Sequence, residues 1–272
     1  MKSGDLEKAL VEATEKVRDT VAARAARGGR GRSVGVGAAG DSTILADKEA
    51  EDVLLKALEP FGARVLSEEA GMTGDPKGGV LAVVDPLDGS SNFERGVPFY
   101  CTSVAMVEGR RLEDVTLGVI RDLVRGDIYI ARRGKGATKN GKRIRTSSTT
   151  KPSDAVVGID ISRSTPQLVS RLAGLASGVK RQTHYGANAL ELCYVADGRI
   201  DAFVDLRGKM RITDFAAAYL IAKEAGAELT DERGGKLVPH FDLDHRFSFV
   251  ASANQRLHGE ILRLCGEGGV RG

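Results

Sequence analysis

The sequence has no tryptophan, three cysteines and few aromatic residues, which make up 5% of its 272 positions. The cysteines are Cys101, Cys193 and Cys265; because they are scattered and odd in number, they predict buried reduced thiols rather than a disulfide framework or a cysteine-rich zinc site. No apolar run approaches the roughly 18 residues that cross a bilayer, and residues 1–10 carry charges where a signal peptide would be apolar. These absences predict a cytoplasmic protein that does not enter a membrane.

A strong excess of charge of either sign is also missing. Forty Lys and Arg face 37 Asp and Glu, for a net charge of +3, which is too small to indicate a nucleic-acid partner by charge alone. The hydrophobic fraction of 42% is that of a globular chain long enough to bury a site in one large domain or two ordinary ones. Any electrostatic function must therefore lie in local clusters.

The first half, residues 1–150, is predicted to place helices on a mostly antiparallel sheet. Apolar residues at helical spacing predict helices over 4–26 and 46–58. The glycine-rich segment 27–41 between them is expected to be a mobile loop, either a plain linker or a lid that carries charge toward a site. Strands are expected at 63–67, 80–84, 102–107, 115–121 and 127–132, with an Asn140-Gly141 hairpin turn.

The second half, residues 151–272, is predicted to be α/β, beyond a polar boundary at 146–153. The overall fold class is therefore α+β. Strands are expected near 155–161, 200–205, 226–230 and 246–252, and helices near 165–177, 187–197, 214–225 and 254–265.

Two carboxylates directly follow the buried strand expected at 80–84. Asp85 and Asp88 stand three residues apart, so a turn could aim both at one point, where they would repel each other without a cation. Hard oxygen ligands with no nearby His or Cys favour Mg²⁺ or Mn²⁺ over zinc. The alternative is an Asp-rich turn whose carboxylates accept hydrogen bonds from local backbone amides.

Other polar groups are expected close to this pair. Gly89, Ser90 and Ser91 would present backbone amides at a helix start, which is a phosphate-binding arrangement. Glu68 and Glu69 end the preceding strand, and pairing of neighbouring strands could bring them beside Asp85. Asp214 opens another expected helix, where favourable charge in the first turn is an equally good explanation.

These motifs resemble those of the inositol monophosphatase superfamily of metal-dependent phosphatases over nearly the whole chain. The matching strings are D-P-L-D-G-S-S-N-F at 85–93, S-E-E at 67–69, T-D-F-A-A-A at 213–218 and G-A-N-A-L at 186–190. The basic segment D-L-R-G-K-M-R at 205–211, expected to be a loop, is most similar to archaeal members, which act on both fructose 1,6-bisphosphate and inositol monophosphates. The resemblance implies a layered αβαβα sandwich.

The resemblance also implies a set of metal ligands. Glu68, Asp85 and the Leu87 carbonyl match the ligands of a first ion, and Asp85, Asp88 and Asp214 match those of a second. The cofactor implied is Mg²⁺, as two or three ions, with Mn²⁺ possible.

Catalytic roles follow from the same resemblance. Ser90, paired with Asp47, matches the groups that orient the attacking water, and Glu68 counts among the catalytic residues as well as the ligands. The amides of Gly89 and Ser90 would hold the phosphate. The expected lid carries Asp41 where some relatives have a more extended acidic pattern, which argues against a third ion at Asp41 or Glu68.

Substrate contacts are implied at Gly186, Ala187 and Asp205, which match positions that meet the hydroxyls of the released alcohol. Asp205 precedes Asp214 by nine residues where the family pattern has seven, which indicates a two-residue insertion. Arg207, Lys209 and Arg211 alternate along the segment before Asp214, so at least one pair is expected to face a second phosphate. Arg207 is the sharper probe, because an Arg guanidinium binds phosphate in a bidentate way.

The leading hypothesis is Mg²⁺-dependent hydrolysis of sugar and polyol phosphate monoesters by metal-activated water, in an enzyme that forms a homodimer as its relatives do. Within the superfamily, the alternative is a phosphatase for adenosine 3′,5′-bisphosphate or NADP, which the low aromatic content disfavours. A second alternative is a catalytically silent regulatory or RNA-associated protein that uses the basic cluster at 24–32. That cluster lacks the interleaved aromatics that stack on bases, so a nucleic-acid partner is not expected.

Overall fold

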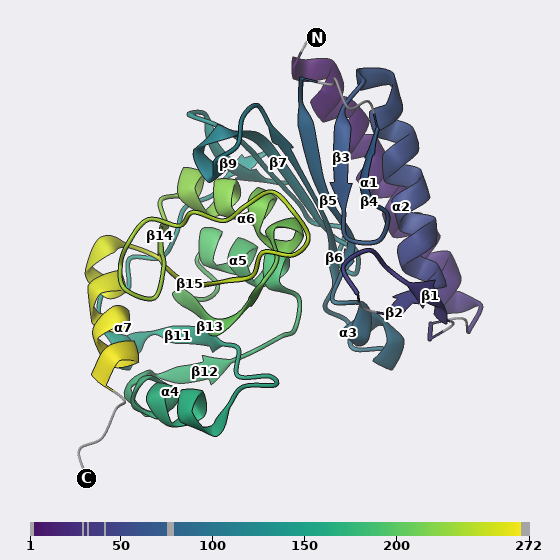
Figure 1. Ribbon diagram of the computed structural model, residues 1–272. Helices are drawn as coiled ribbons and strands as arrows, with labels where there is room; N and C mark the ends of the chain where they lie inside the picture. The colour runs from purple at the N-terminus through teal and green to yellow at the C-terminus, as the bar shows by residue number, and fades with distance from the viewer. Residues whose placement is uncertain (1–2, 29, 32, 41, 75–78, 268–272) are drawn as a thin grey trace.

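The computed structural model describes residues 3–28, 30–31, 33–40, 42–74 and 79–267. Helices and sheets alternate in five layers, which confirms the αβαβα sandwich (Figure 1). The helices of the layers are, in order, α1 (Ser3–Ala26) with α2 (Leu45–Leu58), then α5 (Asn188–Ala196) with α6 (Ile212–Ala225), then α4 (Pro166–Gly178) with α7 (Gln255–Glu267). No helix in these ranges is long and apolar enough to span a membrane.

The eight-stranded sheet lies between the first two helical layers and is antiparallel except where β3 and β5 pair in parallel. Its spatial order is β10-β9-β8-β7-β6-β5-β3-β4. The strands are β3 (Arg64–Ser67), β4 (Gly71–Gly74), β5 (Leu81–Asp88), β6 (Cys101–Val107), β7 (Val115–Asp122), β8 (Ile128–Arg132), β9 (Gly136–Lys139) and β10 (Lys142–Arg143). The expected hairpin turn at Asn140-Gly141 joins β9 to β10.

The five-stranded sheet lies between the second and third helical layers, in the order β12-β11-β13-β15-β14. Its strands are β11 (Val156–Ile159), β12 (Arg181–Thr183), β13 (Ala202–Met210), β14 (Glu228–Thr230) and β15 (Phe247–Ser252). The strands and helices expected in this half are all present within a few residues. The short strands β4 and β12 were not expected.

Two loop expectations are wrong. Part of segment 27–41 is ordered as strand β1 (Ser33–Val36), which pairs with β2 (Ser42–Ile44) in a small antiparallel sheet. All of β1 is exposed, so no alternation of apolar residues announces it. The basic segment at 205–211 is also not a loop, because β13 continues to Met210 after its pairing with β15 breaks at Asp205.

Strand β5 separates two hydrophobic cores. Its side chains alternate between the layers: Ala82 and Val84 join the cluster under α1 and α2, whereas Leu81 and Val83 join the cluster under α5 and α6. The second cluster contains residues of both sheets, so the two halves share one core although the sheets divide near residue 150. The division into halves at 1–150 and 151–272 stays a prediction. All three cysteines are buried and free, as expected.

Candidate active site

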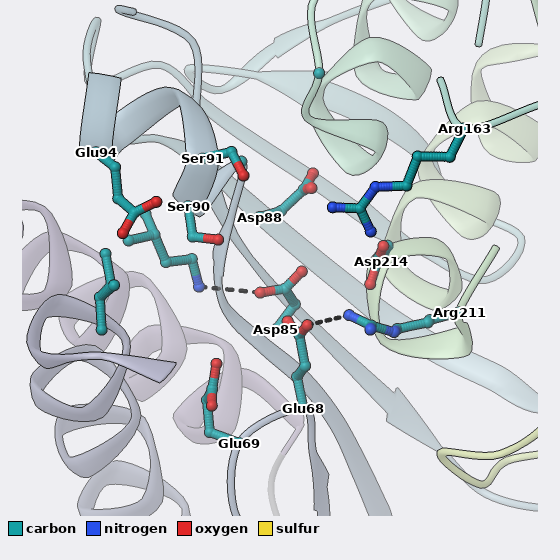
Figure 2. Close-up of a pocket in the computed structure, with 14 residues that line it drawn as sticks. Glu68, Glu69, Asp85, Asp88, Ser90, Ser91, Glu94, Arg163, Arg211 and Asp214 are labelled. Carbon is teal, nitrogen blue, oxygen red and sulfur yellow. Dashed lines mark hydrogen bonds and ion pairs between the residues drawn. The ribbon is translucent and has the colours of Figure 1, made fainter. Parts of the chain in front are cut away.

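Three carboxylates from both halves of the chain meet at the carboxyl end of β5. The parallel pairing of β3 with β5 sets Ser67 beside Val84, so Glu68 follows directly next to Asp85. Asp214 lies in the first turn of α6, in the middle helical layer. One oxygen of each of these carboxylates lies within 4.8 Å of the others, and Figure 2 shows the three side chains turned toward one another.

These carboxylates border a cavity of about 340 Å³ between the two halves. Acidic groups dominate its wall, with two guanidinium groups on the side of the second half (Figure 2). The lining residues are Ile44, Glu68, Glu69, Asp85, Leu87, Asp88, Gly89, Ser90, Ser91, Glu94, Arg163, Gly186, Arg211 and Asp214.

The electrostatics of the three carboxylates show that their charge is poorly compensated. Burial raises the pKa of Asp85 well above its ordinary value, and the charges of Glu68 and Asp214 raise it further. Burial and the charge of Asp214 likewise raise the pKa of Glu68, against the opposing effect of Arg211. Burial also raises the pKa of Asp214, although Arg211 and a hydrogen bond from Thr213 act in the other direction.

Asp88 lies in the same cavity, but the structure does not place it in this group of three. Its two oxygens accept hydrogen bonds from the backbone N–H groups of Asn188 (3.1 Å) and Ala189 (2.7 Å), the first residues of α5. Burial nevertheless raises the pKa of Asp88 to about 8, with a further contribution from Asp214. The alternative of local turn amides therefore holds for Asp85, whose Oδ1 accepts from the Leu87 N–H at 3.0 Å, but not for Asp88, which meets a distant helix start. The role of Asp88 as a ligand stays a prediction.

The segment after Asp88 forms the predicted helix start, α3 (Ser90–Arg95). Gly89 adopts φ +90°, and a Cβ there would lie 3.0 Å from the Phe99 carbonyl oxygen and 3.0 Å from the Ala187 Cβ. Only glycine fits this turn without strain. Gly89, Ser90 and Ser91 all line the cavity, as a phosphate-binding role for this turn requires.

The predicted pair of Ser90 and Asp47 is not joined by a hydrogen bond among the described residues. Asp47 is buried in the first turn of α2, where its Oδ2 accepts a hydrogen bond from the Ile44 N–H at 2.8 Å. Burial raises the pKa of Asp47 to about 7, and Glu69 adds to the rise. Ser90 and Ile44 line the cavity. Asp47 follows Ile44 in the chain, is buried, and is not among the residues that line the cavity.

The predicted substrate contacts are divided between the cavity and the protein interior. Gly186 lines the cavity, whereas Ala187 is fully buried beneath it. Asp205 is also fully buried, and its oxygens accept hydrogen bonds from Arg207 at 2.9 and 2.7 Å. Arg207 pairs with Asp160 as well, so both Asp205 and Arg207 lie outside the cavity wall.

Among the charged lining residues, Glu69, Glu94 and Arg163 were not assigned a role from the sequence, whereas Arg211 belongs to the basic segment that was predicted to face a second phosphate. Glu69 and Glu94 add negative charge to the wall, and Arg163 and Arg211 add positive charge. Arg163 adopts φ +53°, which is sparsely populated for a residue other than glycine. Its position after β11 could have drawn attention to it, because strand ends of both sheets meet at the cavity. Asp41, discussed above for a third ion, lies outside the described residues.

The donor set fits a hard divalent cation. Three carboxylates offer oxygen atoms to one point, and neither His nor Cys is among the cavity residues. A bound cation would remove the repulsion that raises their pKa values. This is the chemistry expected of a metal centre that handles phosphate.

Comparison with known proteins agrees with this geometry. A family model described as the inositol monophosphatase family matches residues 5–268. The fructose-1,6-bisphosphatase/inositol-1-monophosphatase of Thermococcus kodakarensis is 39% identical over 232 residues, which is 85% of this chain and 86% of that protein.

Solved structures give the same result. An inositol monophosphatase-fructose 1,6-bisphosphatase superposes with a TM-score of 0.85 at 31% identity, over 97% of this chain and 100% of that one. The extragenic suppressor protein suhB from Bartonella henselae also superposes with a TM-score of 0.85, at 26% identity, over 98% of this chain and 100% of that one. With its carboxylate-lined cavity and a family match over almost its whole length, this chain belongs to the inositol monophosphatase family of phosphatases.

Proposed function

We propose that this phosphatase uses Mg²⁺ to hydrolyse phosphate monoesters of sugars and polyols, with fructose 1,6-bisphosphate and inositol monophosphates as substrates. The observation that carries the proposal is the convergence of Glu68, Asp85 and Asp214 on one point of the cavity. The relative from Thermococcus kodakarensis, whose name contains both activities, supports the choice of substrates.

Glu68, Asp85, Asp214 and the Leu87 carbonyl would hold the ions, joined by Asp88 at the end of β5. When bound, divalent cations would lower the pKa of water and neutralise phosphate charge as the ester oxygen departs. Gly89, Ser90 and Gly186 line the cavity. The protein would position the substrate, with the amides of Gly89 and Ser90 on the phosphate and Gly186 beside the alcohol. Positioning and charge are sufficient for this reaction class.

Ser90 would orient and deprotonate the attacking water, with Asp47 acting behind it. Exposure of Ser90 to the cavity supports this role, and the raised pKa of Asp47, about 7, suits a group that exchanges a proton near neutrality. Ser90→Ala should lower kcat by roughly 10² to 10⁴ with little change in metal affinity. A loss seen only in metal affinity would make the hydroxyl a structural group instead.

A second phosphate would meet the basic side of the cavity. Arg163 and Arg211 line the wall there, on either side of Asp214 (Figure 2). Arg207, the residue singled out from the sequence, is held by Asp160 and Asp205. Comparing Arg163→Ala with Arg207→Ala tests which residue selects the bisphosphate. The variant that lacks the selecting residue should raise KM for fructose 1,6-bisphosphate far more than for a monophosphate.

The experiment that tests the function is phosphate release from a panel of esters with and without Mg²⁺. The panel contains fructose 1,6-bisphosphate, inositol 1-phosphate, adenosine 3′,5′-bisphosphate and NADP. Metal-dependent release from the first two supports the proposal. Preference for either nucleotide favours the alternative within the superfamily, and no release from any ester favours the catalytically silent, RNA-associated alternative.

We also propose that the enzyme is a cytoplasmic homodimer that binds neither membranes nor nucleic acid. Three buried free thiols agree with a reducing compartment. Sedimentation of the purified chain tests the dimer directly.

A further inference from the structure

An internal cation already occupies part of the carboxylate group. The Arg211 guanidinium forms an ion pair with Glu68 Oε1, which Figure 2 marks with a dashed line. Both side chains are only 17% exposed, so water screens the pair weakly. Arg211 precedes α6 and Glu68 follows β3, so this pair connects the two halves of the molecule across the cavity.

Arg211 acts on two of the three carboxylates that converge. Its positive charge opposes the rise in the pKa of Glu68 and the rise in the pKa of Asp214. Geometry shows the contact with Glu68 directly, and Arg211 stands at the start of α6, three residues before Asp214. Arg211 therefore supplies the charge compensation that a divalent cation would supply at the same point.

We propose that Arg211 is the resident counter-ion of the metal centre: it holds Glu68 when no divalent cation is bound and releases it when one binds. This inference rests on the proposed metal-dependent function. Because a cation must displace the guanidinium from Glu68, the ion pair weakens metal binding. The released guanidinium stays in the cavity wall, where an anionic substrate offers it a new partner.

The proposal makes metal and phosphate binding mutually dependent. An anion that engages Arg211 removes the competitor from Glu68, so phosphate should tighten metal binding, and by linkage metal should tighten phosphate binding by the same factor. Part of this coupling should disappear when residue 211 has no charge.

The test measures Mn²⁺ binding to the intact chain by the electron paramagnetic resonance of free Mn²⁺, with and without inorganic phosphate. Arg211→Gln should bind Mn²⁺ about tenfold more tightly than the parent without phosphate, because a competing charge is gone. Arg163→Gln is the matched control: it removes a positive charge from the same wall, although the dashed pair with Glu68 stays intact. It should change the dissociation constant by about twofold or less.

Phosphate should tighten Mn²⁺ binding less in Arg211→Gln than in the parent. Arg211→Lys keeps a charge without the planar fork and should fall between the two, which gives a second variant if Arg211→Gln folds poorly. The metal-free Arg211→Gln protein should also melt at a lower temperature than the parent and gain more from added Mn²⁺, since its carboxylates lack their counter-ion.

Equal tightening in Arg211→Gln and Arg163→Gln would overturn the proposal in favour of a general field effect. Unchanged or weaker Mn²⁺ binding in Arg211→Gln would overturn it in favour of a structural role. If the parent binds no Mn²⁺, or if Asp85→Asn does not abolish the binding, the metal centre itself is wrong and this inference falls with it. The parent titration thus separates failure of the proposed function from failure of the role of Arg211.

Discussion

Two groups of acidic residues differ in what neutralises them. In the first, Glu68, Asp85 and Asp214 all have raised pKa values, and Arg211 partly compensates the charge of Glu68 and Asp214. In the second, Asp160 and Asp205 are fully or nearly fully buried, and both accept from the Arg207 guanidinium. We infer that the first group is built to receive a cation from solution, whereas the second carries its cation within the chain.

The second group also shapes the cavity wall. His184 Nδ1 lies 3.1 Å from Glu191 Oε1, and His184 Nε2 lies 3.5 Å from Asp160 Oδ1. Glu191 in turn accepts hydrogen bonds from the backbone N–H groups of Tyr185 and Gly186. Internal pairing therefore fixes the turn that contains Gly186, while the under-compensated group stays available for chemistry.

The largest expected effect separates the groups by turnover. Asp214→Asn should lower kcat by about 10³ or more, because several kcal/mol of charge stabilisation depends on the bound cations. The metal-free variant should be as stable as the parent or slightly more so, because carboxylate repulsion is relieved. Phosphate release and urea unfolding measure the two quantities. Turnover near that of the parent at modest Mg²⁺ would remove Asp214 from the metal centre.

The second expected effect is on stability. Arg207→Met should lower the free energy of unfolding by about 3 kcal/mol, because Asp160 and Asp205 then lose their shared counter-ion in a buried setting. Arg163→Met, which removes a more exposed guanidinium, should cost about 0.5 kcal/mol or less. Urea unfolding of both variants measures the difference. Equal costs would show that Arg207 is not the counter-ion of this group.

The third effect is a pH dependence that comes from the first group together with Asp88, which lines the same cavity. Raised pKa values, about 8 for Asp88, mean that the folded protein binds protons more tightly than the unfolded chain. Stability of the metal-free protein should therefore fall as the pH rises from about 4, the ordinary pKa of Asp, toward 8.

Added Mg²⁺ should remove much of this fall, and Asp85→Asn should reduce it without metal. Unfolding in urea at several pH values, with a chelator or with Mg²⁺, measures the slope. A metal-free protein whose stability rises over this range would contradict the assigned repulsion.

The smallest effect concerns His184. Burial alone lowers its pKa, but the hydrogen bond and charge of Glu191, with the charge of Asp160, outweigh this and raise it. A raised pKa stabilises the fold fully below about pH 6.5, the ordinary value, and the contribution disappears as the pH rises through the folded pKa. His184→Gln should therefore cost about 1 kcal/mol at pH 5.5 and less at pH 9. A cost independent of pH would assign His184 to packing alone.

Local sequence determined the elements that place the site. The apolar run before Asp85 predicted a buried strand, and the helical periodicity around Asp214 predicted a helix, because one period of side-chain burial identifies each element. The glycine at position 89 likewise indicated a turn, which its φ of +90° requires. By contrast, β1 lacked any such signal, since all its residues are exposed and its pairing depends on the backbone alone.

Only the tertiary structure decided which group within the chain compensates the charge of each carboxylate. In sequence, Asp85, Asp88, Asp205 and Asp214 are alike, and Arg207 and Arg211 are two equivalent basic residues of one segment. Folding sends Arg207 into the interior to Asp160 and Asp205, sends Arg211 across the cavity to Glu68, and places Asp88 on the amides of α5. Asp88 and Ala189 are 101 residues apart and Glu68 and Arg211 are 143 apart. A charge interaction depends on distance in space and on burial, neither of which the order of residues specifies.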